Sequence, residues 1–348
     1  MSMWLLSNAL LFVLAPPQGF VSSLSLPPIE ASSAPVGAEQ PAAQTTPPGG
    51  PIPIRIGVPS KTDDFIVVYL AKSLGLFERQ GLQATILPMT SSVAMAALQS
   101  GELDFWTGAG SGAKAAETGR PVRIVFVSSS APGQLIIGAK GVSTLTDLRG
   151  KSIAVKVPLD TTSLVTQYLL KQAGVLPDAF HLVYARTTEN EVALLISGQV
   201  AAANLETGPG LLMQARGFPL LASAASVKLL GTGLVTSLDE IRSRPDVIRR
   251  AIAAVKEALR IILSDKARTV AVMERELHEP HEIAAQSYDI AWSRWLPDGI
   301  PPAEAIQNEI ALDTEALQGA HVNRPEPIRP EDILDLSFLQ GGAPAGRP

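Results

Sequence analysis

Short β-branched runs alternate with amphipathic helical segments along most of this chain, and this alternation restricts the fold more than any other feature. The run IRIGV at 54–58 precedes a segment with apolar residues at helical spacing, and LQATILPM at 82–89 is the next strand-like run. The same order continues to about residue 224. Strands that alternate with helices in this way form mostly parallel sheets with helices on both faces. The sequence therefore predicts an α/β fold.

A short sequence motif that occurs twice between residues 54 and 224 indicates two similar α/β units. Ser-Gly ends an apolar helical run at 100–101 and again at 197–198, and a short strand-like segment follows each time. Each half has the order strand, helix, strand, helix ending in Ser-Gly, strand. Glycine is also a common residue after a helix, so a chance echo is the alternative interpretation.

The pattern changes after about residue 230, where longer helical segments replace the alternation. The segment 237–265 is amphipathic, and Pro245 suits the first turn of a helix. Further helical segments follow at 281–296 and 302–319. We expect this helical tail to pack on the first α/β unit and residues 341–348 to be disordered.

Composition narrows the classes of function. A chain of 348 residues with 46% apolar and 18% charged residues is typical of two folded domains. The net charge of −5 leaves no basic surplus to neutralise phosphates, so we expect no nucleic-acid partner. The absence of cysteine excludes disulfides, thiolate metal sites and a cysteine nucleophile.

The N-terminus has the pattern of an export signal. The run WLLSNALLFVLA at 4–15 is as long as a signal-peptide core and too short to span a bilayer, although no basic residue precedes Arg55. We predict a signal-like leader at 1–38, cleaved before Glu39, and a Pro/Gly-rich linker at 39–53. An uncleaved membrane anchor is the alternative.

Small and polar residues gather where the predicted strands end, which is where α/β sheets bind ligands. GAGSGA at 108–113 has the glycine spacing of a dinucleotide-binding loop. The next strand, however, ends in Ser128–Ser130 rather than in the acidic residue that would hold a ribose. A small-residue loop whose backbone N–H groups approach a ligand is the favoured interpretation.

The hydroxyl cluster Thr161–Ser163 opens a helix directly after a predicted strand. Its hydroxyls and the free N–H groups of a first helical turn suit an anion or a carbonyl. Ordinary N-capping uses the same residue types, and the carboxylate of Asp160 would compete with an anion for the same donors. Both interpretations remain open.

The sequence gives little support for a metal site or for catalysis. His278 and His281 lie close together, but no third ligand is evident near them. There is no G-x-S-x-G motif and no pair of acidic residues placed for acid–base chemistry. We therefore predict neither a cofactor nor an enzymatic activity.

Several phrases together resemble a known family: LAKSLGLFERQGLQATI, ALQSGELDF, TGRPVRIV, STLTDLRGKSIAV and ALLISGQV. They are similar to the nitrate/sulfonate/taurine-type (NMT1/THI5-like) substrate-binding proteins of ABC transporters, over residues 54–265. The resemblance implies a type II periplasmic-binding-protein fold, with two α/β lobes and a ligand cleft that closes like a hinge. It implies a first lobe at 54–140 and 225–340 and a second lobe at 141–224.

The resemblance also implies a function: a monomeric receptor exported to the periplasm or cell exterior, which delivers a small organic or anionic ligand (a sulfonate, a carboxylate or a related compound) to a membrane permease. The alternative is an enzyme of the same fold, related to thiamine-pyrimidine or menaquinone-pathway synthesis; the pyrimidine synthases carry a cysteine-rich motif that this chain lacks. Many members have Gly before Ser or Thr where this chain has Asp160-Thr161. The ligand-binding residues implied at the cleft-lining turns are Ser60, Lys61, Thr62, Asp63, Ser91, Ser92, Gly108, Gly110, Ser111, Ser128, Ser129, Thr161, Thr162, Glu206 and Thr207.

Overall fold

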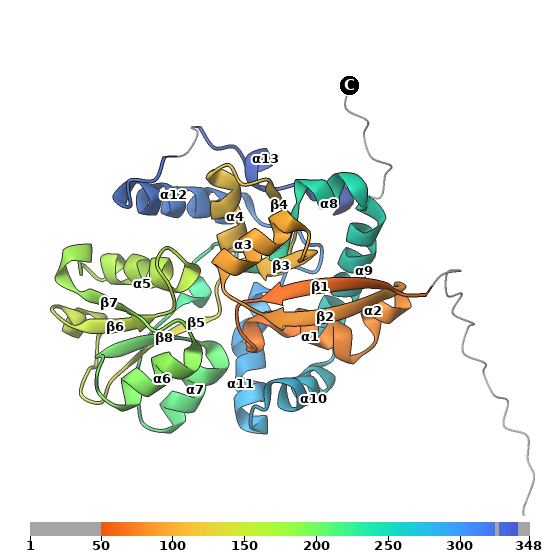
Figure 1. Cartoon of the computed structure of the whole chain (residues 1–348). Coiled ribbons are helices and arrows are strands. Elements are labelled where there is room, and N and C mark those ends of the chain that lie inside the picture. Colours follow the sequence, from red (N-terminus) through yellow and green to blue (C-terminus); the bar gives the residue numbers. More distant parts are fainter. Residues whose placement is uncertain (1–49, 324–326, 340–348) are drawn as a thin grey trace, which may run out of the picture. The chain divides into compact units, whose positions relative to one another are not determined.

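The strands of the computed structural model, which describes residues 50–323 and 327–339, form two five-stranded sheets (Figure 1). The predicted alternation of strands and helices is confirmed. The first sheet has the strand order β2 (Leu82–Pro88), β1 (Ile52–Val58), β3 (Phe105–Gly108), β10 (Thr232–Ser237) and β4 (Val122–Val127). The second has the order β7 (His181–Tyr184), β6 (Ser152–Val155), β8 (Ala202–Glu206), β5 (Gln134–Gly138) and β9 (Leu220–Ser223).

The two sheets have equivalent topology. Three parallel strands lie side by side in each sheet, in the order β2, β1, β3 in the first and β7, β6, β8 in the second. The next strand of each sheet is antiparallel to them. This antiparallel strand is β10 in the first sheet and β5 in the second. Gly101 and Gly198 lie at the ends of equivalent helices with φ angles of 73° and 71°, just before β3 and β8. The repeated Ser-Gly phrase therefore reflects a repeated fold.

Two connections join the units, which we call the first lobe (residues 50–127 and 232–277) and the second lobe (residues 134–223). Residues 128–133 lead from β4 to β5, and residues 224–231 lead from β9 back to β10. The sequence prediction placed 134–140 in the first lobe. In the structure this segment contains β5 of the second sheet, because its backbone pairs with β8 and β9.

Helices cover the sheets because successive strand residues face opposite sides. In the second lobe, Leu135 and Ile137 of β5 pack towards α6 and α7, whereas Ile136 packs towards α5. Figure 1 shows α5 on one face of this sheet and α6 and α7 on the other. The second-lobe helices are α5 (Thr161–Gln172), α6 (Thr188–Ile196) and α7 (Thr207–Ala215).

The long helix α9 (Pro245–Ser264) packs on the first lobe through one apolar face. Its buried residues recur every three or four positions, and they join the core formed by β1 and α1. Pro245 lies in its first turn, as predicted. The other helices of this lobe are α1 (Ile66–Ser73), α2 (Leu76–Arg79), α3 (Ser91–Ser100), α4 (Ala109–Glu117), α8 (Leu238–Ser243) and α10 (Lys266–Leu277).

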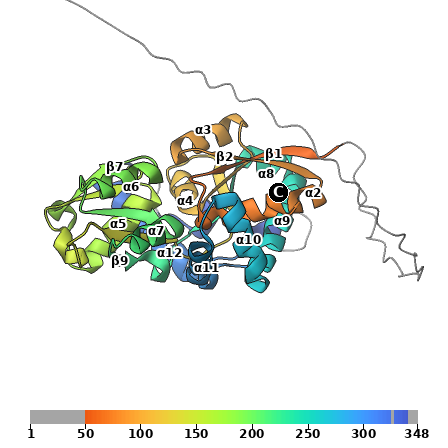
Figure 2. The same cartoon turned by 90° about the horizontal axis from the view of Figure 1, so that it is seen from below.

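The rest of the helical tail contacts both lobes. Ile283 of α11 (His281–Ala291) belongs to the core of the second lobe. α12 (Ala303–Gly319) forms an ion pair with α4 through Asp313 and Lys114, and one with α5 through Glu315 and Lys171, at 3.2 and 2.7 Å. The expected packing on the first unit holds for α9 and α10 but is incomplete for α11 and α12. Figure 2 shows α10 and α11 from below. The short segments η5 (Trp292–Arg294), α13 (Pro330–Ile333) and η6 (Leu336–Leu339) complete the tail.

Between residues 50 and 323 and from 327 to 339, no helix combines the length and apolar character needed to cross a membrane. The predicted leader at 1–38, most of the predicted linker and the predicted tail at 341–348 lie outside the described residues. Ile52 and Pro53, which we assigned to the linker, belong to β1.

Candidate functional site

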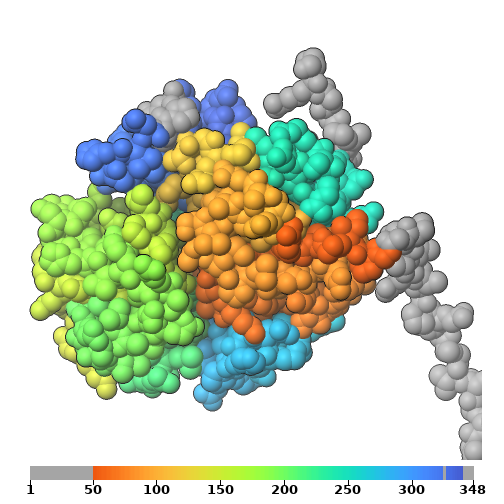
Figure 3. Space-filling view, viewed as in Figure 1, coloured from red at the N-terminus to blue at the C-terminus, as the bar shows by residue number. Residues whose placement is uncertain are grey.

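A cavity of about 80 Å³ lies between the two lobes. It is bordered by loops at the carboxyl ends of the parallel strands, which is where α/β sheets place their ligand sites. Phe65, Ser91 and Gly108 line it from the first lobe, and Lys156 and Asp160 line it from the second. Figure 3 shows the seam where the second lobe, in green, meets the first lobe, in orange. A ligand in this cavity would therefore contact both lobes.

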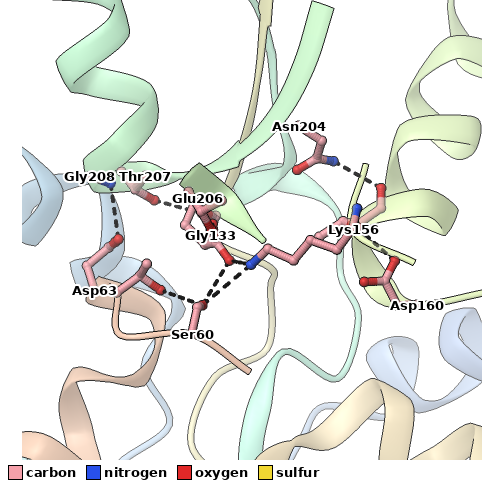
Figure 4. A network of polar contacts seen from close by, with 12 residues as sticks. Ser60, Asp63, Gly133, Lys156, Asp160, Asn204, Glu206, Thr207 and Gly208 are labelled. Carbon is pink, nitrogen blue, oxygen red and sulfur yellow. Dashed lines mark hydrogen bonds and ion pairs between the residues drawn. The ribbon is translucent and has the colours of Figure 1, made fainter. Parts of the chain in front are cut away.

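One wall of the cavity is a polar network centred on Glu206, the last residue of β8 (Figure 4). Lys156, which directly follows β6, pairs with Oε1 of Glu206. The same oxygen accepts a hydrogen bond from Ser60 of the first lobe at 3.0 Å, and Oε2 accepts one from Thr188 at 3.0 Å. Burial lowers the pKa of Lys156, although the charge of Glu191 acts in the opposite direction. The charges of Lys156 and Glu206 are thus compensated within the chain, and the network links the lobes.

The N-terminus of α5 is capped by a side chain of its own loop. Oδ1 of Asp160 accepts hydrogen bonds from the backbone N–H of Ser163 at 2.9 Å and from the hydroxyl of Thr162 at 2.7 Å. Burial raises the pKa of Asp160, and these two hydrogen bonds oppose the shift. The arrangement favours the capping interpretation of the hydroxyl cluster, because a carboxylate already occupies donors that an anion would need.

Buried charges connect the first lobe with the N-terminus of α7. Oδ1 of Asp63 accepts a hydrogen bond from the backbone N–H of Gly208 at 3.1 Å. Arg294 of the tail lies 3.6 Å from Oδ2 of Asp63 and 2.5 Å from Oδ1 of Asp64. Burial and the charge of Asp64 raise the pKa of Asp63 to about 6, while Arg294 and the Gly208 N–H oppose the shift. Gly133 is needed beside this cluster, because a Cβ there would lie 1.7 Å from Arg294 Nη1.

A second carboxyl group approaches the same helix end. Glu279 is 9% exposed, and a Cβ added to Gly208 would lie 1.9 Å from its Oε1. Burial raises the pKa of Glu279 to about 8, with a further contribution from the charge of Asp63. A side chain at position 208 would therefore have to displace the carboxyl group of Glu279.

The serine run at 128–130 lies in the hinge. Ser128 N–H donates to the carbonyl of Thr232 at 2.8 Å, and Ser129 Oγ accepts from Thr232 N–H at 3.0 Å. The hydroxyls of Ser128 and Thr232 are 2.8 Å apart. These contacts join the two connections between the lobes and use the polar groups of the predicted ligand residues Ser128 and Ser129.

The other predicted residues lie in and around the cavity. Lys61 is exposed, 5.9 Å from the ring centre of Tyr69, and Ser92 is exposed on α3. A Cβ added to the buried Gly110 would lie 2.8 Å from Oε1 of Glu309. Thr62 Oγ1 lies 3.2 Å from Ser60 Oγ, and Thr207 Oγ1 donates to the carbonyl of Gly133 at 2.9 Å. The predicted residues that line the cavity are Ser91, Gly108, Ser111, Thr161, Thr162 and Glu206.

The cavity also contains polar and aromatic residues that were not predicted, among them Lys156, Arg186, Trp106 and Gln134. Lys156 and Arg186 follow β6 and β7 directly, so their place at strand ends was the available signal. Trp106 lies in β3, and its Nε1 donates to Ser111 Oγ at 2.8 Å. Gln134 begins β5, and its position became clear only when β5 was seen to pair with β8.

No group of three or more histidine and carboxylate side chains within the described ranges could hold a metal ion. Nδ1 of His281 pairs with Glu274 instead. His278 adopts a left-handed backbone conformation, with φ of 59°, at the end of α10. The two histidines therefore have local structural roles.

Residues 62–268, more than half of the chain, match the sequence model of the NMT1/THI5-like family. A protein of Brucella abortus with only a general binding-protein name is 25% identical over 218 residues. The match covers 60% of this chain and 66% of that relative, slightly under two thirds of its length.

Solved structures with the same fold include two binding proteins and an enzyme. The alkanesulfonate-binding protein SsuA of Xanthomonas axonopodis pv. citri has a TM-score of 0.68 at 19% identity, with 80% of this chain and 96% of that chain covered. The periplasmic nitrate-binding protein NrtA of Synechocystis has a TM-score of 0.61 at 15% identity, with 79% and 91% covered. The desulfurization enzyme DSZB has a TM-score of 0.60 at 14% identity, with 83% and 97% covered. These similarities establish the fold.

Proposed function

This chain belongs to the NMT1/THI5-like family, and from that membership we propose that it is the solute-binding receptor of an ABC importer. Its role would be to capture a small organic ligand outside the cytoplasm and to deliver it to a membrane permease. The receptor would act as a monomer, without a cofactor, after export by the predicted leader. The receptors for alkanesulfonate and nitrate that share its fold support this proposal.

The observation that carries the proposal is the cavity between the lobes. Both lobes line it, and Ser60 of the first lobe is hydrogen-bonded to Glu206 of the second directly at its wall. A ligand in such a cavity has more contacts when the lobes are together than when they are apart. It would therefore stabilise the closed arrangement through its differential affinity for the two states.

Binding is favoured over catalysis because Lys156, Glu206 and Asp160 of the cavity already interact with other groups of the chain. Lys156 pairs with Glu206, and Asp160 caps α5. A general base or nucleophile needs a side chain that can reach the substrate. The desulfurization enzyme shares the fold, but fold does not determine activity.

A thermal-shift screen of the full-length chain tests the receptor function. The panel contains nitrate and sets of alkyl sulfonates, carboxylates, amides and amidines. A ligand at 100-fold excess over its Kd stabilises the folded state by about 2.7 kcal/mol, which raises the melting midpoint by several degrees. We expect at least one compound to do so.

Two neighbouring substitutions show whether the stabilisation comes from the cavity. Ser91→Trp fills space at the cavity wall and should abolish the shift, whereas Ser92→Trp places the same ring on the exposed side of α3 and should leave it. The proposal fails if no compound stabilises the protein, also after refolding to remove carried-over ligand, or if both variants behave alike.

A further inference from the structure

Apart from the exposed Arg186, the positive groups around the cavity are already neutralised by carboxylates of the chain itself. Lys156 pairs with Glu206, the N-terminus of α5 is capped by Asp160, and Arg294 lies between Asp63 and Asp64. A sulfonate or nitrate bound at any of these three groups would have to displace a carboxylate from its partner. Displacement would leave a buried carboxylate without compensation, which is strongly unfavourable.

The cavity instead presents hydrogen-bond acceptors, and the first is Gln134. Its side chain is 7% exposed and lines the cavity, and Oε1 has no hydrogen-bond partner among the described residues. Gln134 lies directly opposite Glu206 in the antiparallel pair of β5 and β8, so both side chains are on the same side of the sheet. Buried amide oxygens are nearly always hydrogen-bonded, so this atom requires a donor.

The second acceptor is Asp160. Its Oδ1 holds the first turn of α5, whereas Oδ2 accepts no hydrogen bond from the described part of the chain. The preceding residue, Leu159, has φ of 59°, a left-handed conformation that is unfavourable for a residue with a side chain. This unfavourable conformation directly precedes Asp160, which lines the cavity.

From these acceptors we propose that the ligand presents an N–H donor head group, of the amide or amidine class, to Gln134 and Asp160, and that oxyanions are poor ligands. This inference rests on the proposed receptor function and specifies its ligand. The body of the ligand would lie against the apolar wall formed by Phe65, Met89 and Val157. Neutral amides and cationic amidines share this donor chemistry, and the experiment separates them.

Arg186 is the one lining cation without a side-chain ion pair among the described residues. It is exposed, so water and salt screen its charge, and an isolated exposed cation contributes little to binding. An oxyanion held by Arg186 is the competing outcome of the experiment below.

The test compares benzamide, benzamidine and benzenesulfonate, which share one ring and differ in head group. Isothermal titration calorimetry of the full-length protein should give the two N–H compounds at least about tenfold higher affinity than benzenesulfonate, the difference expected for one good hydrogen bond. Gln134→Leu should weaken both by about tenfold, and Gln134→Glu, which keeps an acceptor, should retain benzamidine binding. This retention also shows that position 134 tolerates change without loss of the fold.

Asp160→Asn separates charge from hydrogen bonding. The amide oxygen of asparagine still caps a helix and still accepts a hydrogen bond, so benzamide affinity should change little. Benzamidine should lose about tenfold or more, because its cationic head group loses a charge-assisted bond. Glu189→Gln, on the exposed start of α6 and outside the cavity, removes the same charge and should change neither.

Tighter binding of benzenesulfonate than of the N–H compounds in the wild type, together with its loss in Arg186→Gln, would overturn the inference and leave the receptor function intact. Equal effects of Asp160→Asn and Glu189→Gln would overturn the role of Asp160. If none of the three probes binds, the head-group inference fails, and the broader screen decides the receptor function separately.

Discussion

Buried carboxyl groups outnumber their cationic partner where the lobes and the tail meet. Arg294 faces Asp63 and Asp64, and Glu279 lies beside the same helix end. Because burial disfavours the charged form, the pKa of Asp63 rises to about 6 and that of Glu279 to about 8. At neutral pH the folded protein therefore holds protons that the unfolded chain releases.

These shifts predict that stability falls as the pH rises. Glu279 has an ordinary pKa of 4.5, so between about pH 4.5 and 8 the folded state binds the extra proton. The free energy of unfolding then decreases with pH, by at most about 1.4 kcal/mol per unit for one proton. Glu279→Gln should remove one proton's share of this slope between pH 6 and 8, as measured by chemical denaturation at pH 6, 7 and 8.

Glu309 and Glu282 provide the controls for this dependence of stability on pH. Burial and Asp313 raise the pKa of Glu309 to about 8, against the opposing charge of Lys114, so part of the slope should remain in the variant. Glu282→Gln, on the exposed side of α11, should leave the whole slope unchanged. An unchanged slope in Glu279→Gln would show that this carboxyl group is not protonated in the folded protein near pH 7.

The sequence predicted the site residues whose positions depend on the order of neighbouring strands and helices along the chain. Ser60 and Asp63 lie in the segment between β1 and α1, and Glu206 is the last residue of β8. Strand ends of this kind can be recognised from the sequence. Arg294 and Glu279 could not be placed in this way, because they approach the site from the tail, far along the chain. Their contacts depend on how α11 packs, which no local pattern specifies.

At the scale of elements, the N-terminus of α7 contacts the tail so closely that a side chain at position 208 would collide with the carboxyl group of Glu279. We predict that Gly208→Ala weakens ligand binding by about tenfold or more, since its Cβ would lie 1.9 Å from Glu279 Oε1 and would force the helix away from Asp63. Gly208→Ala combined with Glu279→Ala should restore much of the affinity, as measured by calorimetry with the best compound of the screen.

Gly319→Ala provides the matched control, because a Cβ there meets nothing within 4 Å. This variant should bind normally and be as stable as the wild type or slightly more stable, since alanine favours helices over glycine. Normal binding by Gly208→Ala would mean that α7 can move without affecting the cavity.

The repeated order of elements could be predicted because each unit is local in sequence. The assignment of β5 could not, because QLIIG is apolar on both faces and suits either sheet. Its place depends on pairing with β8 and β9, and these strands lie about 65 to 85 residues further along the chain. The same long-range pairing brings Gln134 opposite Glu206. Because the sequence prediction placed β5 in the first lobe, it did not identify Gln134 as a cavity residue.

At the scale of the whole described structure, two equivalent units contribute equivalent loops to one cavity. Ser60 and Lys156 lie just after β1 and β6, and β3 and β8 lead directly into α4 and α7. The two connections between the lobes are hydrogen-bonded to each other through Ser129 and Thr232. We therefore propose that the two lobes move about this hinge and that the ligand holds them together.

The distance between the lobes tests this claim most directly. The chain contains no cysteine, so Ala96→Cys on α3 and Ala193→Cys on α6 can carry spin labels at two exposed positions, one on each lobe. Without ligand, we predict a broad distance distribution with a longer component. A compound that raises the melting midpoint should leave one narrow, shorter component. A control pair within the first lobe, Glu78→Cys with Ala96→Cys, should not respond. Identical distributions with and without a bound compound would contradict closure as the mechanism.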